Sequence, residues 1–315
     1  MKETSPAVER HPGRVLSAAG GVYDVELDDR SVVQASLRGR LKLEARTGDK
    51  VVAGDRVEIA RDGTGATIES VEPRRTELAR RAPGRSRGAK VVVANPDQLV
   101  AVFALTHPAP NPRLLDRFLV TAEVNGLPAV IVANKSDLLE EGTPGDVFAP
   151  QEAAGYRVLR TSVKTGAGLD ALREILCGNT SVLTGPSGVG KSSLLNAIEP
   201  GLTLSVGAVS DAVGKGRHTT VTSRLIPLVC GGYVADTPGL RELGLWDVDA
   251  AQLADAFPEF REHAETCRFA PTCSHSHEPG CGVTAAIRKG RIHPDRHASY
   301  LALLEEIRDG ERKRW

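Results

Sequence analysis

The sequence predicts three modules in series: a small all-β barrel, an α/β domain with a parallel sheet, and a small, mainly helical domain around a cysteine cluster. Three observations predict this order. Apolar and polar residues alternate up to Val71, buried-strand runs alternate with helical patterns from Val91, and cysteines crowd together from Cys267 onward. A chain of 315 residues has room for two or three domains, since single cores stop growing at about 250 to 300 residues.

Composition places the chain among soluble globular proteins. Hydrophobic residues make up 41% of it, charged residues 25%, and the formal net charge is +0. No global field therefore draws the protein to nucleic acid, and any such binding must rest on local basic patches. Met1 to Arg14 lacks the apolar core of a signal peptide, and no later run approaches a membrane span. We expect a cytoplasmic protein that contacts no membrane.

The amino-terminal segment has the period-two pattern of half-buried strands. Between Gly13 and Val71, runs such as Tyr23 to Leu27 and Val33 to Leu37 alternate apolar and polar residues and are separated by glycine- and aspartate-containing breaks. About five strands in some sixty residues predict a small barrel of the OB type. A small sandwich without a binding role is the alternative interpretation.

A basic stretch follows the predicted barrel. It holds seven cations within seventeen residues, and breakers at Pro83-Gly84 and Arg87-Gly88 predict a flexible linker. The cations could neutralise RNA phosphates, or they could form a solvated face. They are Arg74, Arg75, Arg80, Arg81, Arg85, Arg87 and Lys90.

From Val91 the pattern changes to buried strands alternating with helices. Leu99 to Leu105 and Ala129 to Ala133 have the composition of buried strands, and Pro112 to Val124 between them has a helical period. Such alternation predicts a parallel sheet with crossover helices. Further strands are expected at Val158 to Thr161, Ser181 to Thr184 and Tyr233 to Asp236, and further helices at Leu169 to Leu176 and Lys191 to Ile198.

A glycine-rich motif lies between the predicted Ser181 to Thr184 strand and a helix, the context of a phosphate-binding P-loop. Its glycines let backbone N–H groups turn toward phosphates, Lys191 places a cation between the β- and γ-phosphates, and Ser192 offers a hydroxyl to Mg²⁺. The alternative is a tight turn without a ligand. The expected phosphate-binding residues are Gly185, Pro186, Ser187, Gly188, Val189, Gly190, Lys191, Ser192 and Ser193.

Two tetrapeptides predict which base is bound. Asn134-Lys135-Ser136-Asp137 resembles the guanine-specificity motif of GTPases, because an Asp carboxylate can accept two hydrogen bonds from guanine that adenine cannot supply. Thr161-Ser162-Val163-Lys164 resembles the companion loop whose backbone contacts the guanine carbonyl. Each follows a predicted strand, and open α/β sheets bind ligands at the carboxyl ends of their strands.

Two further segments resemble the switches with which GTPases sense the γ-phosphate. In Asp236-Thr237-Pro238-Gly239, Asp236 is expected to reach Mg²⁺ and Gly239 the γ-phosphate. The segment Gly214 to Thr220 fits a mobile switch whose hydroxyls bind Mg²⁺ only when the γ-phosphate is present. Thr219 and Thr220 both remain candidates for this ligand.

Ordinary GTPases carry the P-loop first and the base-recognition motifs last, whereas here the base-recognition motifs come first. The sequence therefore predicts an α/β P-loop GTPase domain with circularly permuted motifs. Leu240 stands where a water-orienting Gln is expected, so intrinsic hydrolysis should be slow unless another group or a partner assists. His218 is the nearest candidate for this catalytic role. A surface histidine on a mobile loop is the alternative.

Three of the five cysteines share a fifteen-residue stretch with a histidine, and this Cys₃His set suits one tetrahedral Zn²⁺. A small module with few apolar residues needs a bound metal to stabilise its fold. His277 and, more weakly, His263 are alternative fourth ligands, whereas Cys177 and Cys230 stand alone. The predicted zinc ligands are Cys267, Cys273, His275 and Cys281.

Together these features resemble the ribosome small-subunit-dependent GTPase A family over nearly the whole chain. The resemblance implies that GTP is hydrolysed to GDP and phosphate during late small-subunit maturation, with stimulation by the subunit and with His218 as a catalytic residue. One departure is that five residues separate Cys267 from Cys273, where the family usually shows four. Besides the permuted order, the matching segments are Ala94 to Gln98, Gly216 to Thr220, Gly239 to Trp246 and Cys273 to Cys281.

We place the barrel and basic linker at residues 1–85, the GTPase domain at 86–248 and the zinc-binding domain at 249–315, which ends in a helix with Tyr300, Leu304 and Ile307 on one face. The expected cofactors are one Zn²⁺ per subunit and Mg²⁺ with GTP. The expected partners are GTP or GDP and the small ribosomal subunit with its rRNA, and we expect a monomer. A nucleotide kinase and a binding module with negligible turnover are the rival functions.

Overall fold

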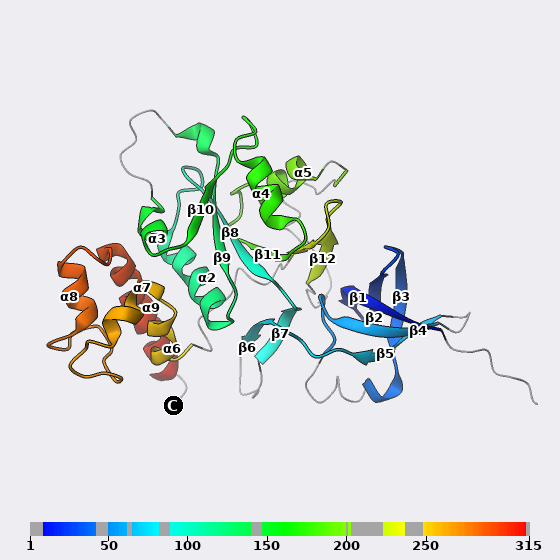
Figure 1. Cartoon of the computed structure of the whole chain (residues 1–315), viewed down its shortest axis with the longest axis horizontal. Helices are drawn as coiled ribbons and strands as arrows, with labels where there is room; N and C mark the ends of the chain where they lie inside the picture. Colours follow the sequence, from blue (N-terminus) through cyan, green and yellow to red (C-terminus); the bar gives the residue numbers. More distant parts are fainter. Residues whose placement is uncertain are drawn as a thin grey trace, which may run out of the picture. The chain divides into compact units, whose positions relative to one another are not determined.

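The structure is a computed structural model that describes residues 9–41, 50–61, 65–81, 89–139, 147–199, 201–202, 223–236 and 248–312 (Figure 1). By packing, the chain divides into two compact units. The first comprises Met1–Asp97, Leu176–Val182 and Ser210–Gly239, and the second comprises Gln98–Ile175, Leu183–Val209 and Leu240–Trp315. The boundaries of the three predicted domains stay a prediction.

A closed five-stranded barrel occupies the beginning of the first unit. Its strands follow the order β1-β2-β3-β5-β4, and β4 pairs back onto β1. Alternate side chains point inward, and Val15, Val25, Ile59 and Ile68 are fully buried. The predicted OB-like barrel is confirmed. The strands are β1 (Glu9–Ala19), β2 (Val22–Leu27), β3 (Val32–Leu37), β4 (Arg56–Arg61) and β5 (Ala66–Val71).

The basic stretch after the barrel is not simply a flexible linker, and that prediction was wrong. β6 (Glu77–Arg81) and β7 (Ala89–Ala94) pair as an antiparallel hairpin with Leu78 fully buried. Arg74 donates from Nε to Oδ1 of the fully buried Asp55 at 2.7 Å. This hydrogen bond raises the pKa of Arg74, although burial opposes the shift. Part of the basic stretch is therefore ordered by buried apolar residues and by distant carboxylates. Arg85 and Arg87 lie outside the described residues.

A second hairpin, which the sequence predicted only in part, also belongs to the first unit. β12 (Arg224–Pro227) pairs antiparallel with β13 (Tyr233–Asp236). β12 also pairs with β1, where Ser17 lies opposite Arg224. The strand Tyr233–Asp236 was expected, but its partner β12 was not. β12 was missed because it offers only two consecutive apolar residues between an arginine and a proline, which is no strand pattern.

Cys177 and Cys230 form a disulfide with Cα atoms 5.4 Å apart, so the prediction that they stand alone was wrong. They are 53 residues apart in the sequence. The Gly178 amide donates to the Gly231 carbonyl at 2.9 Å, which brings the two turns that carry the cysteines together. Sequence spacing alone contains no signal for this contact.

The second unit contains the parallel sheet. Its strand order is β10-β9-β8-β11, and β9 pairs parallel with both β8 and β10. β8 and β11 are buried along their whole lengths, as a sheet covered on both faces requires. The strands are β8 (Gln98–Ala104), β9 (Ala129–Asn134), β10 (Arg157–Arg160) and β11 (Thr180–Thr184), the last of which begins in the first unit.

Helices cover this sheet on both sides, as Figure 1 shows, with α2 and α3 on one side and α4 and α5 on the other. Asn111 caps α2 by accepting a hydrogen bond from the Leu114 amide at 3.0 Å. The expected strands and helices of this domain are confirmed, and α3 was not predicted. The helices are α2 (Pro112–Val124), α3 (Ala149–Ala153), α4 (Leu169–Leu176) and α5 (Lys191–Ile198).

Four helices lie in the described carboxy-terminal residues of the second unit, 248–312. Tyr300, Leu304 and Ile307 of the last helix are buried together, as the sequence predicted. Among the described residues, no helix combines the length and apolar character needed to cross a membrane. The helices are α6 (Ala250–Asp255), α7 (Pro258–Ala264), α8 (Gly282–Arg288) and α9 (Pro294–Arg312).

A buried arginine joins α9 to α2 and α7. Arg296 is 2% exposed, donates through Nε to Glu259 at 2.6 Å and pairs through Nη1 with the fully buried Asp116. Burial works to lower the pKa of Arg296, but the two carboxylates together raise it above its usual value. The guanidinium therefore stays charged and compensates two buried acids.

We predict that Arg296→Met lowers the free energy of unfolding by about 3 to 5 kcal/mol, because Asp116 and Glu259 would remain as buried carboxylates without their cation. Urea denaturation measures the change. Arg312→Met is the control, since the Arg312 side chain is 73% exposed in its pair with Asp309, and it should cost less than about 1 kcal/mol. Equally small effects in both variants would contradict this role for Arg296.

Candidate nucleotide site and metal centre

The P-loop leads from the end of β11 to the first turn of α5. A Cβ at Gly185 would lie 2.0 Å from the Val102 carbonyl oxygen, and one at Gly190 would lie 2.5 Å from Nδ2 of Asn134. Both glycines have positive φ, 137° and 99°. Only glycine allows this close, left-handed path. The loop consequently brings the N–H groups of a helix start to one place, which is the requirement for binding a phosphate.

Lys191 lies against the backbone of this loop. Its side chain is buried, and Nζ donates to the carbonyl oxygens of Gly185 at 2.8 Å and Pro186 at 2.7 Å. Ser192, the next residue, is 6% exposed. A phosphate would be a stronger partner for Nζ than these neutral carbonyls, because the hydrogen bond would then join two charged groups.

The base motif is hydrogen-bonded to the P-loop. Asn134 donates from Nδ2 to the Val189 carbonyl at 2.8 Å and accepts from Oγ1 of Thr161 at 3.0 Å. Lys135 donates from Nζ to the Gly188 carbonyl at 2.7 Å. The Asn134 amide and the Lys135 ammonium thus hold the P-loop against the end of β9.

Asp137 is oriented by the companion loop. Ser162 donates from Oγ to Oδ1 of Asp137 at 2.6 Å, and the Ser136 amide donates to the Thr161 carbonyl at 3.0 Å. The Asp137 carboxylate keeps lone pairs on both oxygens for further donors. Val163 is 39% exposed in the same loop. The arrangement can therefore accept two hydrogen bonds from one base edge.

Three predicted motifs thus come together in the second unit: the P-loop, Asn134 to Asp137, and Thr161 to Lys164. Asp236 ends β13 in the first unit. The remaining predicted residues, His218, Thr219, Thr220 and Gly239, lie outside the described residues.

Sequence reasoning missed one contributor to this site. The His107 carbonyl accepts a hydrogen bond from Nζ of Lys135 at 2.6 Å. His107 follows β8 in a proline-rich loop, and the contact uses its backbone rather than its side chain. No pattern of residue types predicts a role for a backbone carbonyl, although its position at the carboxyl end of a buried strand is a weak signal.

The predicted metal ligands converge in the carboxy-terminal helices. Their ligand atoms all lie within 4.8 Å of one another, and all four residues are buried. Nδ1 of His275 lies 3.5 Å from Sγ of Cys267 and 3.6 Å from Sγ of Cys281, and these two sulfurs are 3.8 Å apart. The fourth ligand is Cys273. The cluster could therefore hold a metal ion.

Neighbouring groups hold the metal-binding loop. His297 Nε2 lies 2.8 Å from the His275 carbonyl, and the Tyr300 hydroxyl donates to the Ser274 carbonyl at 2.8 Å. Both side chains come from α9. Glu278 accepts from the Ser274 amide at 2.7 Å, and such hydrogen bonds lower its pKa to about 2 against the opposing effect of burial. Burial raises the pKa of the Cys273 thiol to about 12, so a cation is needed to hold it as a thiolate.

Two family models match the chain: RsgA N-terminal domain over residues 12–68 and RsgA GTPase over residues 71–246. Relatives called small ribosomal subunit biogenesis GTPase RsgA include that of Gemmatimonas aurantiaca, 53% identical over 94% of this chain and 97% of the relative. The one from Moorella thermoacetica is 45% identical over 95% of this chain and 98% of the relative.

Solved structures show the same likeness. YjeQ from Thermotoga maritima has a TM-score of 0.77 and 37% identity, covering 95% of this chain and 99% of its own. YloQ, described as a circularly permuted GTPase, has a TM-score of 0.74 and 30% identity, covering 98% of each chain. The fold classes predicted from the sequence, including the permuted motif order, are therefore confirmed.

We predict that His275→Ala loses bound metal whereas His277→Ala keeps it. Nδ1 of His275 faces the three thiols, but the His277 side chain is exposed and its Nδ1 lies 2.7 Å from the Ser276 hydroxyl. Elemental analysis of protein purified without chelators measures the metal per chain. Equal metal contents in the two variants would show that the fourth ligand is assigned wrongly.

Proposed function

Because the chain belongs to the RsgA GTPase family, we propose that it binds GTP, hydrolyses it to GDP and phosphate, and acts in late maturation of the small ribosomal subunit. One observation carries the proposal for GTP: the hydrogen bonds of Asn134, Lys135 and Asp137 join the base motif to the P-loop and to the companion loop. The name of the relatives, small ribosomal subunit biogenesis GTPase, supports the biological role.

In this proposal the P-loop, Gly185 to Ser193, surrounds the phosphates, and Lys191 neutralises the β- and γ-phosphates. Ser192, Asp236 and one of the two switch threonines, Thr219 or Thr220, hold Mg²⁺, and Gly239 senses the γ-phosphate. Mg²⁺ would neutralise the charge that develops during phosphoryl transfer. His218 orients or activates the attacking water when the subunit is bound, because Leu240 offers no polar group for this task.

Guanine is the proposed base. The Asp137 carboxylate accepts from N1–H and the exocyclic amine, while the backbone around Ser162, Val163 and Lys164 meets the carbonyl on the same edge. The oriented Asp137–Ser162 pair favours this function over a nucleotide kinase, which lacks an Asn-Lys-x-Asp motif. A GTP-binding module without turnover is the second candidate, and the turnover assay below distinguishes it.

We propose that the metal is Zn²⁺, one per chain. Zn–S bonds of about 2.3 Å and Zn–N bonds of about 2.0 to 2.1 Å give tetrahedral edges of about 3.8 Å between sulfurs and about 3.5 Å between sulfur and nitrogen. The separations among Cys267, Cys281 and His275, 3.5 to 3.8 Å, fit these edges. With Cys273 the set is full, which is typical of a structural rather than a catalytic zinc.

The proposed partner is the small ribosomal subunit with its rRNA, bound by a monomer in the cytoplasm, where ribosomal subunits mature. RNA phosphates would supply part of the affinity, so binding should weaken as salt rises. Arg74 is unsuitable for this purpose, since its side chain is 13% exposed and pairs with the fully buried Asp55.

We predict that Asp137→Asn weakens GTP binding by at least about tenfold and strengthens binding of xanthosine triphosphate, because the donor and acceptor roles at the base edge reverse. Competition titrations with both nucleotides measure the effect. Asp170→Asn, an exposed acid at the start of α4, is the matched control and should leave both affinities unchanged. An unaltered preference in Asp137→Asn would remove the basis of the guanine assignment.

We predict that small subunits stimulate GTP turnover and that His218→Ala reduces the stimulated rate at least about tenfold, a barrier change of about 1.4 kcal/mol, with GTP binding nearly intact. Phosphate release with and without subunits is measured for the wild type, His218→Ala and the control His293→Ala. Absence of stimulated turnover in the wild type would favour the binding module. A normal rate in His218→Ala would assign catalysis to another group.

A further inference from the structure

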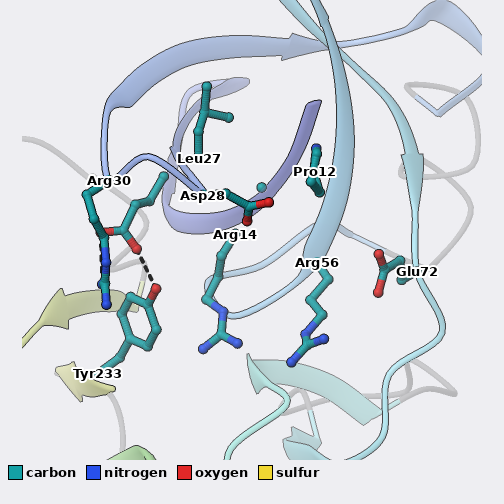
Figure 2. A pocket seen from close by; sticks show the side chains of 10 residues that line it. Pro12, Arg14, Leu27, Asp28, Arg30, Arg56, Glu72 and Tyr233 are labelled. Carbon is teal, nitrogen blue, oxygen red and sulfur yellow. Dashed lines mark hydrogen bonds and ion pairs between the residues drawn. The ribbon is translucent and has the colours of Figure 1, made fainter. Parts of the chain in front are cut away.

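The first unit contains a pocket that the proposed function does not use (Figure 2). Residues of the barrel strands β1, β2 and β4 line it together with Tyr233 of β13, and its volume is about 360 Å³. This volume is at the low end of small-molecule sites and suits one nucleotide-sized ligand. None of its residues belongs to the P-loop or to the base motifs.

Two arginines extend side by side into this pocket, as Figure 2 shows. Arg14 is held in place: Nη1 donates to Oγ1 of Thr180 at 3.0 Å, and its guanidinium carbon lies 4.5 Å from the centre of the Tyr233 ring. Arg56 is exposed, and no described residue forms a hydrogen bond or an ion pair with its guanidinium. One cation is thus fixed, and the other is available.

The two arginine charges repel each other. Burial lowers the pKa of Arg14, and the charge of Arg56 lowers it further, against the opposing effect of Tyr233. The buried Glu26 does not compensate Arg56, because it accepts a hydrogen bond from the Tyr233 hydroxyl and pairs with Arg30 at 3.4 Å. An anion placed between Arg14 and Arg56 would relieve this repulsion.

The pocket also contains acceptors. Among the described residues, the carboxylates of Asp28 and Glu72 have no hydrogen-bond or ion-pair partner, and both line the pocket. With Glu26, three carboxylates balance the three arginines. A polyphosphate would therefore meet repulsion as well as attraction. The better match is a ligand with one phosphate and several hydrogen-bond donors, such as ribose hydroxyls and base amino groups.

We propose that this pocket binds one nucleotide unit, with its phosphate on Arg14 and Arg56 and its ribose or base donors on Asp28 and Glu72. A nucleotide within a single RNA strand and a free 5′-mononucleotide share this chemistry. Of these two ligands, only the RNA strand depends on the proposed function, through its ribosomal partner. The site itself rests on the barrel and β13, and its existence is independent of GTP turnover.

The test uses the full chain saturated with GDP and Mg²⁺, so that a further ligand cannot report on the P-loop. Calorimetry measures binding of each 5′-mononucleotide, the matching nucleosides, inorganic phosphate and a short single-stranded oligoribonucleotide. Arg56→Gln removes the available cation. Arg61→Gln is the matched control, because Arg61 is exposed at the end of the same strand and does not line the pocket. Denaturation midpoints check that both variants fold.

We expect a mononucleotide or the oligonucleotide to bind, the nucleoside to bind at least about tenfold more weakly, and Arg56→Gln, but not Arg61→Gln, to lose at least about tenfold in affinity. If Arg56→Gln weakens binding of the mononucleotide, the ligand is a free nucleotide. If it weakens binding of the oligonucleotide alone, the ligand is an RNA strand. The proposal is overturned if no probe binds at millimolar concentration, if both variants lose affinity equally, or if inorganic phosphate binds as tightly as the nucleotides.

GTP turnover of the same proteins, prepared free of GDP and measured with and without small subunits, separates this inference from the proposed function. Arg56→Gln should keep the wild-type turnover of GTP in the absence of RNA. Absence of GTP turnover in the wild type would refute the GTPase proposal and would not affect the pocket proposal. Normal GTP turnover in the wild type, with no probe bound by the GDP-saturated protein, would refute the pocket proposal and leave the GTPase proposal standing.

Discussion

The side-chain amide of Asn134 is the group on which the nucleotide site most depends. It is 2% exposed, and its two ends hydrogen-bond to Val189 in the P-loop and to Thr161 in the companion loop. A buried amide left without partners costs about 1 to 3 kcal/mol, so this arrangement of the three segments is favoured over one that breaks these hydrogen bonds. The contact joins residues 55 apart in the sequence, so it depends on their positions in the fold and not on which motif comes first in the chain.

The elements that the sequence predicted are those whose patterns are local. The apolar runs of β8 and β9, the glycines of the P-loop and the close spacing of Cys267 to Cys281 all carry their meaning within a short window. The β6-β7 hairpin was missed because the breakers Pro83-Gly84 and Arg87-Gly88 between its strands favoured a linker, and Asp55, which pairs with Arg74, comes from another part of the chain. The pocket of Arg14 and Arg56 has no local signature either, since its residues come from several strands.

Helix α9 connects the metal centre to the sheet domain. On one side, His297 and Tyr300 contact the backbone of the metal-binding loop. On the other, Arg296 pairs with Asp116 of α2, which packs on β8 and β9. A disturbance of the metal ligands would therefore reach α2 through one helix. The metal module is thus part of the packing of the second unit, although its sequence pattern marks it as separate.

The Cys177–Cys230 disulfide turns the intervening chain, which carries the P-loop and β12, into a covalent ring. Closing a loop of 53 residues restricts the unfolded chain by about 4 kcal/mol at 25 °C on a chain-entropy model. The ring also changes what a single backbone cut does. A protease that nicks the chain between the two cysteines leaves both pieces attached, and only a reductant releases them, so the integrity of this region depends on the thiol balance of its surroundings.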